Sequence, residues 1–106
     1  MSPRGIGHAT LAVLQAVADR HRYGFDIIER TGLPSGTVYP ALASLSRRGF
    51  VRSAWEDERV AHGEGRPRRR YYELTGAGET ALQTELRKLR ALGLAGPGVS
   101  GSEATS

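Results

Sequence analysis

The stretch that most restricts the fold of this chain is residues 65–74, which read GRPRRRYYEL. Four arginines surround Pro67 within residues 66–70, and aromatic residues follow them. The proline stiffens the backbone, and the residues after it have strand propensity. An arginine guanidinium carries a permanent charge and offers a forked donor to phosphate. The stretch therefore predicts one strand of a basic hairpin that binds a polyanion, and nucleic acid is the leading candidate.

The partner strand of this hairpin is predicted upstream, over Phe50–Trp55, and the return strand covers Arg68–Leu74. Both segments alternate between apolar and polar side chains, as strands with one buried face do. Residues 56–67 between them are polar and contain glycine. This composition predicts a mobile tip.

The side chains of the hairpin have two competing sets of partners. Arg66 and Arg68 are the favoured phosphate contacts, because alternate residues of an extended strand share one face. Trp55 and Tyr72 are expected to pack beneath the strands. An alternative stays open, in which acids of the hairpin pair with the arginines and neutralise part of the basic patch. Those acids are Glu56, Asp57, Glu58 and Glu64.

Three helices are predicted before the hairpin from apolar residues at spacings of three and four. They cover residues 9–19, residues 23–31 and a third segment that starts near Ser35 and ends at Gly49. Gly32 supplies the stop between the second and third helices. In the second helix, Phe25, Ile27 and Ile28 are expected to face inward. In the third, the buried stripe consists of Val38, Leu42 and Leu45.

The first turn of the third helix carries small polar groups that can approach a groove of DNA closely. Two helices joined by a tight turn, the second with such a tip, form a helix-turn-helix. With the hairpin as its wing, the chain is predicted to be mainly α with a small β-hairpin, a winged helix-turn-helix. Tyr39 has an alternative role, packing against the wing. The predicted DNA contacts are Ser35, Gly36, Thr37, Tyr39 and Pro40 on the helix and Arg66, Arg68, Arg69 and Arg70 on the wing.

A last helix is predicted after Thr75, which can cap its N-terminus. Its leucines recur at spacings of four, three and three, and a small winged domain already closes without them. We therefore expect a homodimer, with packing of this helix on its own domain as the alternative. The predicted interface residues are Leu11, Leu14, Leu82, Leu86, Leu89 and Leu92. The predicted units are residues 1–74 for DNA binding, residues 75–94 for dimerisation and residues 95–106 as a disordered tail.

Composition excludes several other classes of protein. The chain has 106 residues, a formal net charge of +4 and no cysteine, which leaves out disulfides and thiolate chemistry. His8, His21 and His62 fall in three different elements without the spacing of a metal site. No glycine-rich phosphate loop follows a predicted strand. We expect neither an enzyme nor a bound cofactor, and we expect a metal site only if folding or dimerisation brings the three histidines together. With no signal segment and no membrane span, the expected location is the cytoplasm.

Three separated blocks of the chain resemble the PadR family of bacterial transcriptional regulators. They are residues 23–27 in the second helix, residues 33–42 with 45 and 49–51 around the third helix, and residues 55–56 with 65–72, 74–75 and 78 around the wing. The resemblance implies a repressor-like dimer on an inverted-repeat operator, in the compact branch with one short C-terminal helix. It also implies that a small molecule or another signal regulates the protein. One departure is the basic run Ser46-Arg47-Arg48, where relatives often carry acids.

One competing hypothesis remains from the sequence. A winged helix can use the same basic surface to bind RNA or another protein without reading a duplex groove. The operator, the target genes, the effector and the direction of regulation are not encoded in any motif of the chain.

Overall fold

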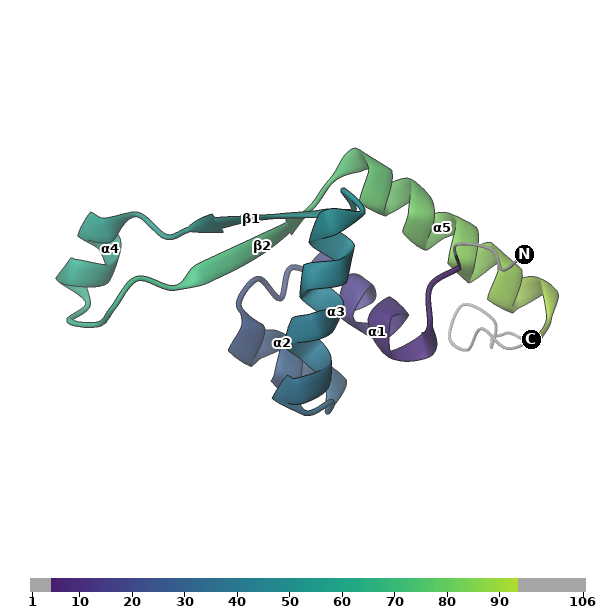
Figure 1. The fold of residues 1–106 in the computed structure, drawn as a ribbon, viewed down its shortest axis with the longest axis horizontal. Coiled ribbons are helices and arrows are strands. Elements are labelled where there is room, and N and C mark those ends of the chain that lie inside the picture. Colours follow the sequence, from purple (N-terminus) through teal and green to yellow (C-terminus); the bar gives the residue numbers. More distant parts are fainter. Residues whose placement is uncertain (1–4, 94–106) are drawn as a thin grey trace, which may run out of the picture.

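The computed structural model of the protein describes residues 5–93, and it is mainly helical with one antiparallel hairpin (Figure 1). The predicted fold class is confirmed. The elements in chain order are α1 (His8–Ala18), α2 (Gly24–Thr31), α3 (Ser35–Arg47), β1 (Val51–Trp55), α4 (Glu58–Gly63), β2 (Arg70–Leu74) and α5 (Gly76–Ala91). The tail expected over residues 95–106 lies outside the described residues. Within residues 5–93, no helix is both long enough and apolar enough to cross a membrane.

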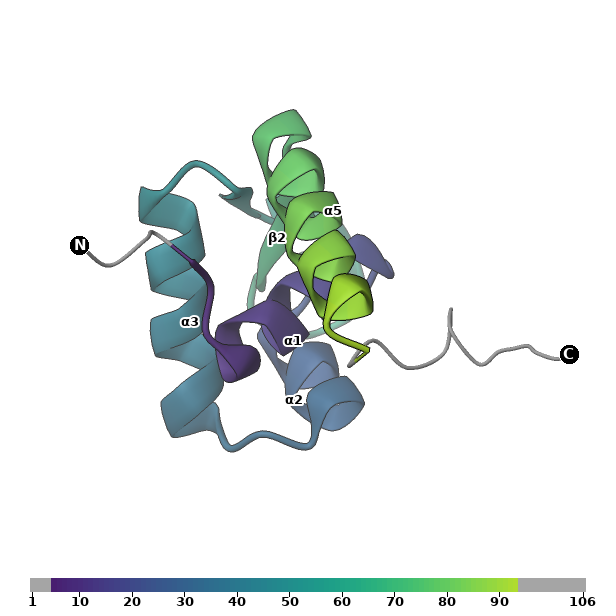
Figure 2. The same ribbon diagram turned by 90° about the vertical axis from the view of Figure 1, so that its right-hand side faces the viewer.

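The core is built around α1, which packs against α2, α3 and α5 (Figure 2). One face of α1 is almost fully buried, and Val13 and Leu14 have no exposed surface. The predicted stripe of α3 is buried against it, and Ile27 of α2 and Leu82 of α5 complete the contact. The buried residues of α3 are Val38, Ala41, Leu42 and Leu45.

This core corrects part of the predicted dimer interface. Leu14 is 0% exposed and Leu82 is 4% exposed in a single chain, so neither has surface to give to a partner. Their apolar area is already removed from water by α1, α3 and α5 of the same molecule. For Leu82, packing on its own domain was the alternative that the sequence left open.

The two-stranded sheet is linked to the segment before α2 by a backbone bridge that the sequence did not predict. β1 and β2 pair in antiparallel register, from Val51 opposite Leu74 to Trp55 opposite Arg70. Tyr23, just before α2, forms an isolated bridge with Tyr71. In addition, the Tyr72 N–H donates to the Arg22 carbonyl over 2.8 Å. The wing is therefore attached to the helix-turn-helix through backbone hydrogen bonds.

The tip of the wing contains a helix, which the polar and glycine-containing composition of residues 56–67 did not predict. Asp57 caps the N-terminus of α4, and its carboxylate accepts a hydrogen bond from the Arg59 N–H over 2.8 Å. Ala61 is buried at 2% exposure, and Gly65 follows with φ of +68°. A helix of this length shows too little periodicity to be recognised, although Asp57 was available as a capping signal. Figure 1 shows α4 at the far end of the hairpin, away from the helical body.

The start of α5 yields a stability prediction. Gly78 lies against the strand that leads from α3, and a Cβ there would collide with the Phe50 carbonyl oxygen and come within 2.9 Å of the Leu74 side chain. Gly78→Ala should therefore destabilise the fold by about 1 to 3 kcal/mol through overpacking, although alanine is the better helix former by about 1 kcal/mol. Urea unfolding followed by circular dichroism measures the change.

The matched control for this substitution is Gly76→Ala in the same helix. A Cβ at Gly76 meets nothing within 4 Å, so we expect a neutral or slightly stabilising effect. Equal stability of the two variants would contradict the packing assigned to Gly78.

Candidate nucleic-acid interface

The N-terminal turn of α3 is an exposed polar edge. Ser35, Gly36 and Pro40 are exposed, and Thr37 is half-buried. The N–H groups of Thr37 and Val38 donate to the Pro34 carbonyl, whereas the amides of Ser35 and Gly36 precede these first bonds. Amides at a helix N-terminus point outward along the axis and suit a phosphate. Pro40 lies inside the helix without an N–H, so the Gly36 carbonyl has no donor four residues on.

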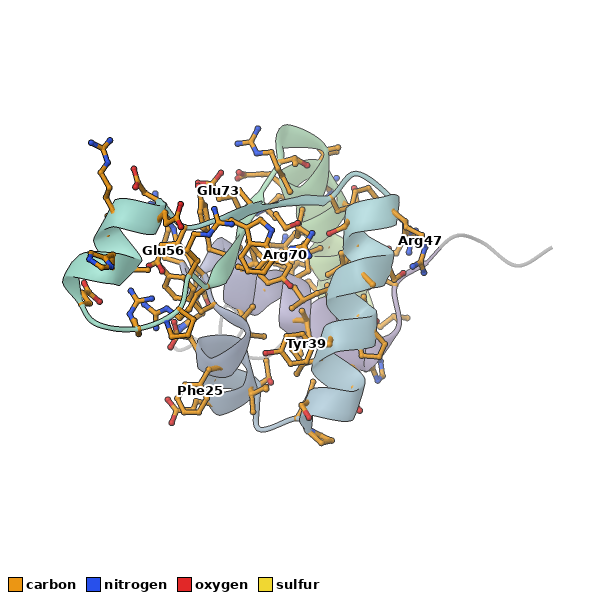
Figure 3. All side chains as sticks on the ribbon, turned by 60° about the vertical axis from the view of Figure 1, so that its left-hand side comes forward. Phe25, Tyr39, Arg47, Glu56, Arg70 and Glu73 are labelled. Carbon is orange, nitrogen blue, oxygen red and sulfur yellow. The ribbon has the colours of Figure 1, made fainter. Side chains whose placement is uncertain are left out.

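Tyr39 projects from this turn toward α2, as Figure 3 shows. Its ring occupies the place that a side chain at Gly24 would take, since a Cβ there would lie 2.6 Å from the ring carbons Cε1 and Cζ. Nevertheless, Tyr39 keeps 47% of its surface exposed. The ring therefore packs on α2 and the base of the wing and still presents an edge to a ligand. The sequence did not reveal that Gly24 makes room for it.

Phe25 is exposed, and the prediction that it faces inward is wrong. It has 66% exposure, because α2 begins at Gly24 and turns Gly24 and Ile27 toward the core. A shallow pocket joins Phe25 to Tyr39, Arg70 and Tyr72. The aromatic surface around Tyr39 thus continues onto α2 (Figure 3).

Two of the wing arginines are arranged around Trp55. The guanidinium carbons of Arg68 and Arg70 each lie 5.5 Å from the centroid of the indole ring. The register places Trp55, Arg70 and Tyr72 on one face of the hairpin, the face that also meets Tyr39. Trp55 is 53% exposed, which corrects the expectation that it packs beneath the wing. Tyr72, in contrast, is buried as predicted, and burial raises the pKa of its hydroxyl.

The other two arginines of the run face a buried carboxylate. Arg66 makes a forked contact with Glu56, with Nη1 to Oε1 at 2.6 Å and Nη2 to Oε2 at 2.8 Å, and its Nε donates to Glu64 at 3.0 Å. Arg69 donates its N–H to Glu56 and stacks over the ring of Tyr23 at 4.0 Å. The side chain of Arg66 is only 23% exposed. Arg66 is therefore a support of the wing, which corrects its expected role as a favoured phosphate contact.

Glu56 connects the wing tip to the helix-turn-helix. It is 8% exposed, and the Tyr23 hydroxyl also donates to it over 3.3 Å. The hydrogen bonds from Arg66 outweigh the opposing effect of desolvation and lower the pKa of Glu56 from 4.5 to about 2. A carboxylate whose pKa is depressed on folding stabilises the fold above its unfolded pKa. That stabilisation is lost as the pH falls from 4.5 toward 2.

A pH titration of stability tests this network. The difference in unfolding free energy between the protein and its Glu56→Gln variant should be constant above about pH 5 and should shrink toward about pH 2. Glu58→Gln, which changes an exposed carboxylate of α4, serves as the control and should show no comparable trend. A Glu56→Gln difference that does not change between these pH values would contradict the ionised network.

A separate apolar groove lies between α1 and α5. It has a volume of about 490 Å³ and is lined by His8, Leu11, Ala12, Gln15, Leu86 and Leu89. Leu92 directly follows the last residue of α5 and is 70% exposed. Of the six predicted interface leucines, Leu86, Leu89 and Leu92 therefore offer apolar surface. Leu11 also lines the groove, but only 8% of its surface is exposed.

The three histidines do not come together with other ligands. Across residues 5–93, no group of three His, Asp or Glu side chains is placed to hold a metal ion.

A helix-turn-helix followed by a hairpin that lies beside it defines the class of winged-helix proteins. The family model described as the transcriptional regulator PadR-like family matches residues 13–84. The chain belongs to this family, whose members are transcription regulators and not enzymes. The resemblance seen in the sequence is thus confirmed.

Solved structures share the fold. A PadR family transcription regulator from Clostridium difficile has a TM-score of 0.72 at 23% identity, over 82% of this chain and 92% of its own. A PadR-like transcription factor from Bacteroides fragilis has a TM-score of 0.68 at 25% identity, over 79% and 82%. BpsR from Bordetella bronchiseptica has a TM-score of 0.69 at 17% identity, over 88% and 66%. No curated protein matches the sequence significantly.

Proposed function

We propose that the protein is a transcriptional repressor that binds an inverted-repeat DNA operator as a homodimer. The observation that carries this proposal is the shared face of the α3 tip and the wing, where Tyr39 and Arg70 line one pocket. The first turn of α3 enters the major groove with Ser35, Gly36 and Thr37, and Tyr39 and Pro40 lie along its edge. Arg68 and Arg70, with the half-exposed Arg69, meet the adjacent phosphates or minor groove.

The proposed dimer uses the apolar groove between α1 and α5. Burying a leucine contributes about 1.5 to 3 kcal/mol, and the groove leaves Leu86 and Leu89 only half-buried in one chain. A two-fold axis there pairs two α3 tips, which need a separation of about 34 Å to reach successive major-groove sites. The repressor role rests on the resemblance to the family.

We further propose that a small molecule or another signal of unknown identity acts through this groove. BpsR, which shares the fold, is a protein whose DNA binding is regulated by 6-hydroxynicotinic acid. An apolar groove at a dimer interface lets a ligand change the spacing of two wings by binding one arrangement better than the other. The effector of this protein is not identified by any residue of the groove.

Selection from a duplex library with a randomised core tests the proposed function. The expected result is enrichment of a palindromic site whose affinity exceeds that of scrambled duplex and single-stranded RNA at near-physiological salt. Light scattering of the complex should give two chains per duplex. Equal binding of scrambled duplex would refute operator recognition, and a preference for RNA would favour the competing hypothesis of an RNA-binding winged helix.

A further inference from the structure

The four arginines of the wing are divided between two environments. Arg66 and Arg69 both reach the carboxylate of Glu56, at 2.6 and 3.7 Å. Arg68 and Arg70 form no salt bridge among residues 5–93 and lie instead against the two-ring surface of Trp55. Arg66 and Arg69 therefore share the charge of one carboxylate, and Arg69 stays half-exposed, whereas Arg68 and Arg70 are not paired with an acid of the described residues.

The indole ring of Trp55 orients the guanidinium groups of Arg68 and Arg70. Two guanidinium groups that lie against one ring repel each other. The attraction between each positive charge and the negative face of the ring offsets part of this repulsion. Arg70 is held further by a hydrogen bond from its Nε to the Ser53 hydroxyl at 3.2 Å. Trp55 is 53% exposed, so the arrangement faces solvent on the side of the hairpin that meets Tyr39. An arginine held in one orientation loses less rotamer entropy on binding.

We propose that Trp55 is a positioning residue that presets Arg68 and Arg70 for a narrow minor groove beside each half-site, so that the protein prefers A·T-rich flanks. This inference rests on the proposed function. Runs of A·T pairs narrow the minor groove and strengthen its negative potential, which attracts arginine without base-specific hydrogen bonds. A pair of guanidinium groups at fixed separation matches such a groove better than two freely rotating side chains.

The test compares Trp55→Leu with Trp55→Phe. Leucine keeps apolar volume but has no π face, whereas phenylalanine keeps a ring on which guanidinium can stack. The probes are two duplexes with the core selected by the unaltered protein, one flanked by A·T runs and one by G·C runs. Trp55→Leu should bind the A·T-flanked duplex about three- to tenfold more weakly, with little change for the other, and Trp55→Phe should restore most of the preference.

A double-variant background separates positioning from general support of the wing. When Arg68 and Arg70 are both alanine, Trp55→Leu should have no further effect on either duplex. Trp55 is the one tryptophan of the chain, so its fluorescence reports on the contact directly. In the free protein, acrylamide should quench it more strongly in the double-alanine variant, where guanidinium groups no longer cover the ring.

The outcomes of these experiments separate failure of the positioning role of Trp55 from failure of the proposed operator binding. If the unaltered protein enriches no duplex, the proposed function and this inference both fail. If it enriches a palindrome but Trp55→Leu keeps the full A·T preference, or weakens both duplexes equally, the positioning role alone is refuted. Failure of Trp55→Phe to rescue a stable, folded variant has the same consequence.

Discussion

Gly36→Glu is expected to lower affinity for the selected operator about 100-fold or more while the protein stays folded. Gly36 lies in the first turn of α3, it is exposed, and a Cβ there meets nothing within 4 Å. The added carboxylate would enter the major groove with the first turn of α3, close to DNA phosphates, and like charges at an interface cost several kcal/mol. The same carboxylate is favourable for the helix, because it lies at the positive end of the dipole.

The matched control is Ala77→Glu. Ala77 is also exposed at the second position of a helix, so the change in net charge and in helix-dipole energy is the same on α5. Filter binding at one salt concentration should show near-normal affinity for this variant, reduced only by the general loss of one positive unit of net charge. Gly36→Ala should also bind nearly normally. Equal losses for Gly36→Glu and Ala77→Glu would remove the α3 tip from the interface.

Apart from α4, the helices and strands of the described chain could be predicted because each has a local cause. α1 and α3 carry apolar residues at helical spacing, and Gly32 ends α2 with φ of +74°. Thr75 caps α5 by accepting a hydrogen bond from the Gly78 N–H at 3.0 Å. These signals act within one or two turns of helix, so they can be recognised in the sequence without knowledge of the fold.

The exposed aromatics could not be predicted because tertiary contacts decide which face of a short element is covered. Phe25 and Ile27 are both apolar, but only Ile27 meets α1 and the core. Trp55 continues the buried face of β1 in register, yet the hairpin extends beyond the helical body at that point (Figure 1). Apolar character alone therefore predicted burial for two residues that lie on the proposed DNA face.

The roles of the wing arginines depended on one acid. The sequence does not distinguish Glu56 from the other three acids of the hairpin, but in the structure it is buried at the root of the tip and pairs with Arg66. Arginines that look alike in the sequence therefore have different partners in the structure. The pairing depends on α4, which folds residues 58–63 back so that Arg66 comes beside Glu56. The sequence offered pairing between hairpin acids and arginines as an alternative, and the structure bears it out for Arg66, but without α4 the sequence could not show which acid and which arginine meet.

Leu89→Glu is expected to convert the proposed dimer to monomers and to weaken operator binding about 100-fold. The leucine lines the α1–α5 groove and is half-buried in one chain, so on each side of a two-fold interface the substitution removes part of the about 1.5 to 3 kcal/mol that full burial of a leucine contributes. It also places two carboxylates near each other across the axis. Sedimentation or light scattering at micromolar concentration measures the mass, and a single half-site duplex should be bound with nearly unchanged affinity.

The control for this change is Gln83→Glu, which introduces the same charge on an exposed position of α5 away from the leucine stripe. It should remain dimeric and should bind the palindrome normally. Because a monomer keeps its α3 tip and wing, loss of affinity for the palindrome without loss for the half-site isolates pairing as the cause. An unchanged dimer mass for Leu89→Glu in dilute solution would place the interface elsewhere, since a charged side chain at the centre of an apolar contact leaves an unpaired buried carboxylate that no small rearrangement satisfies.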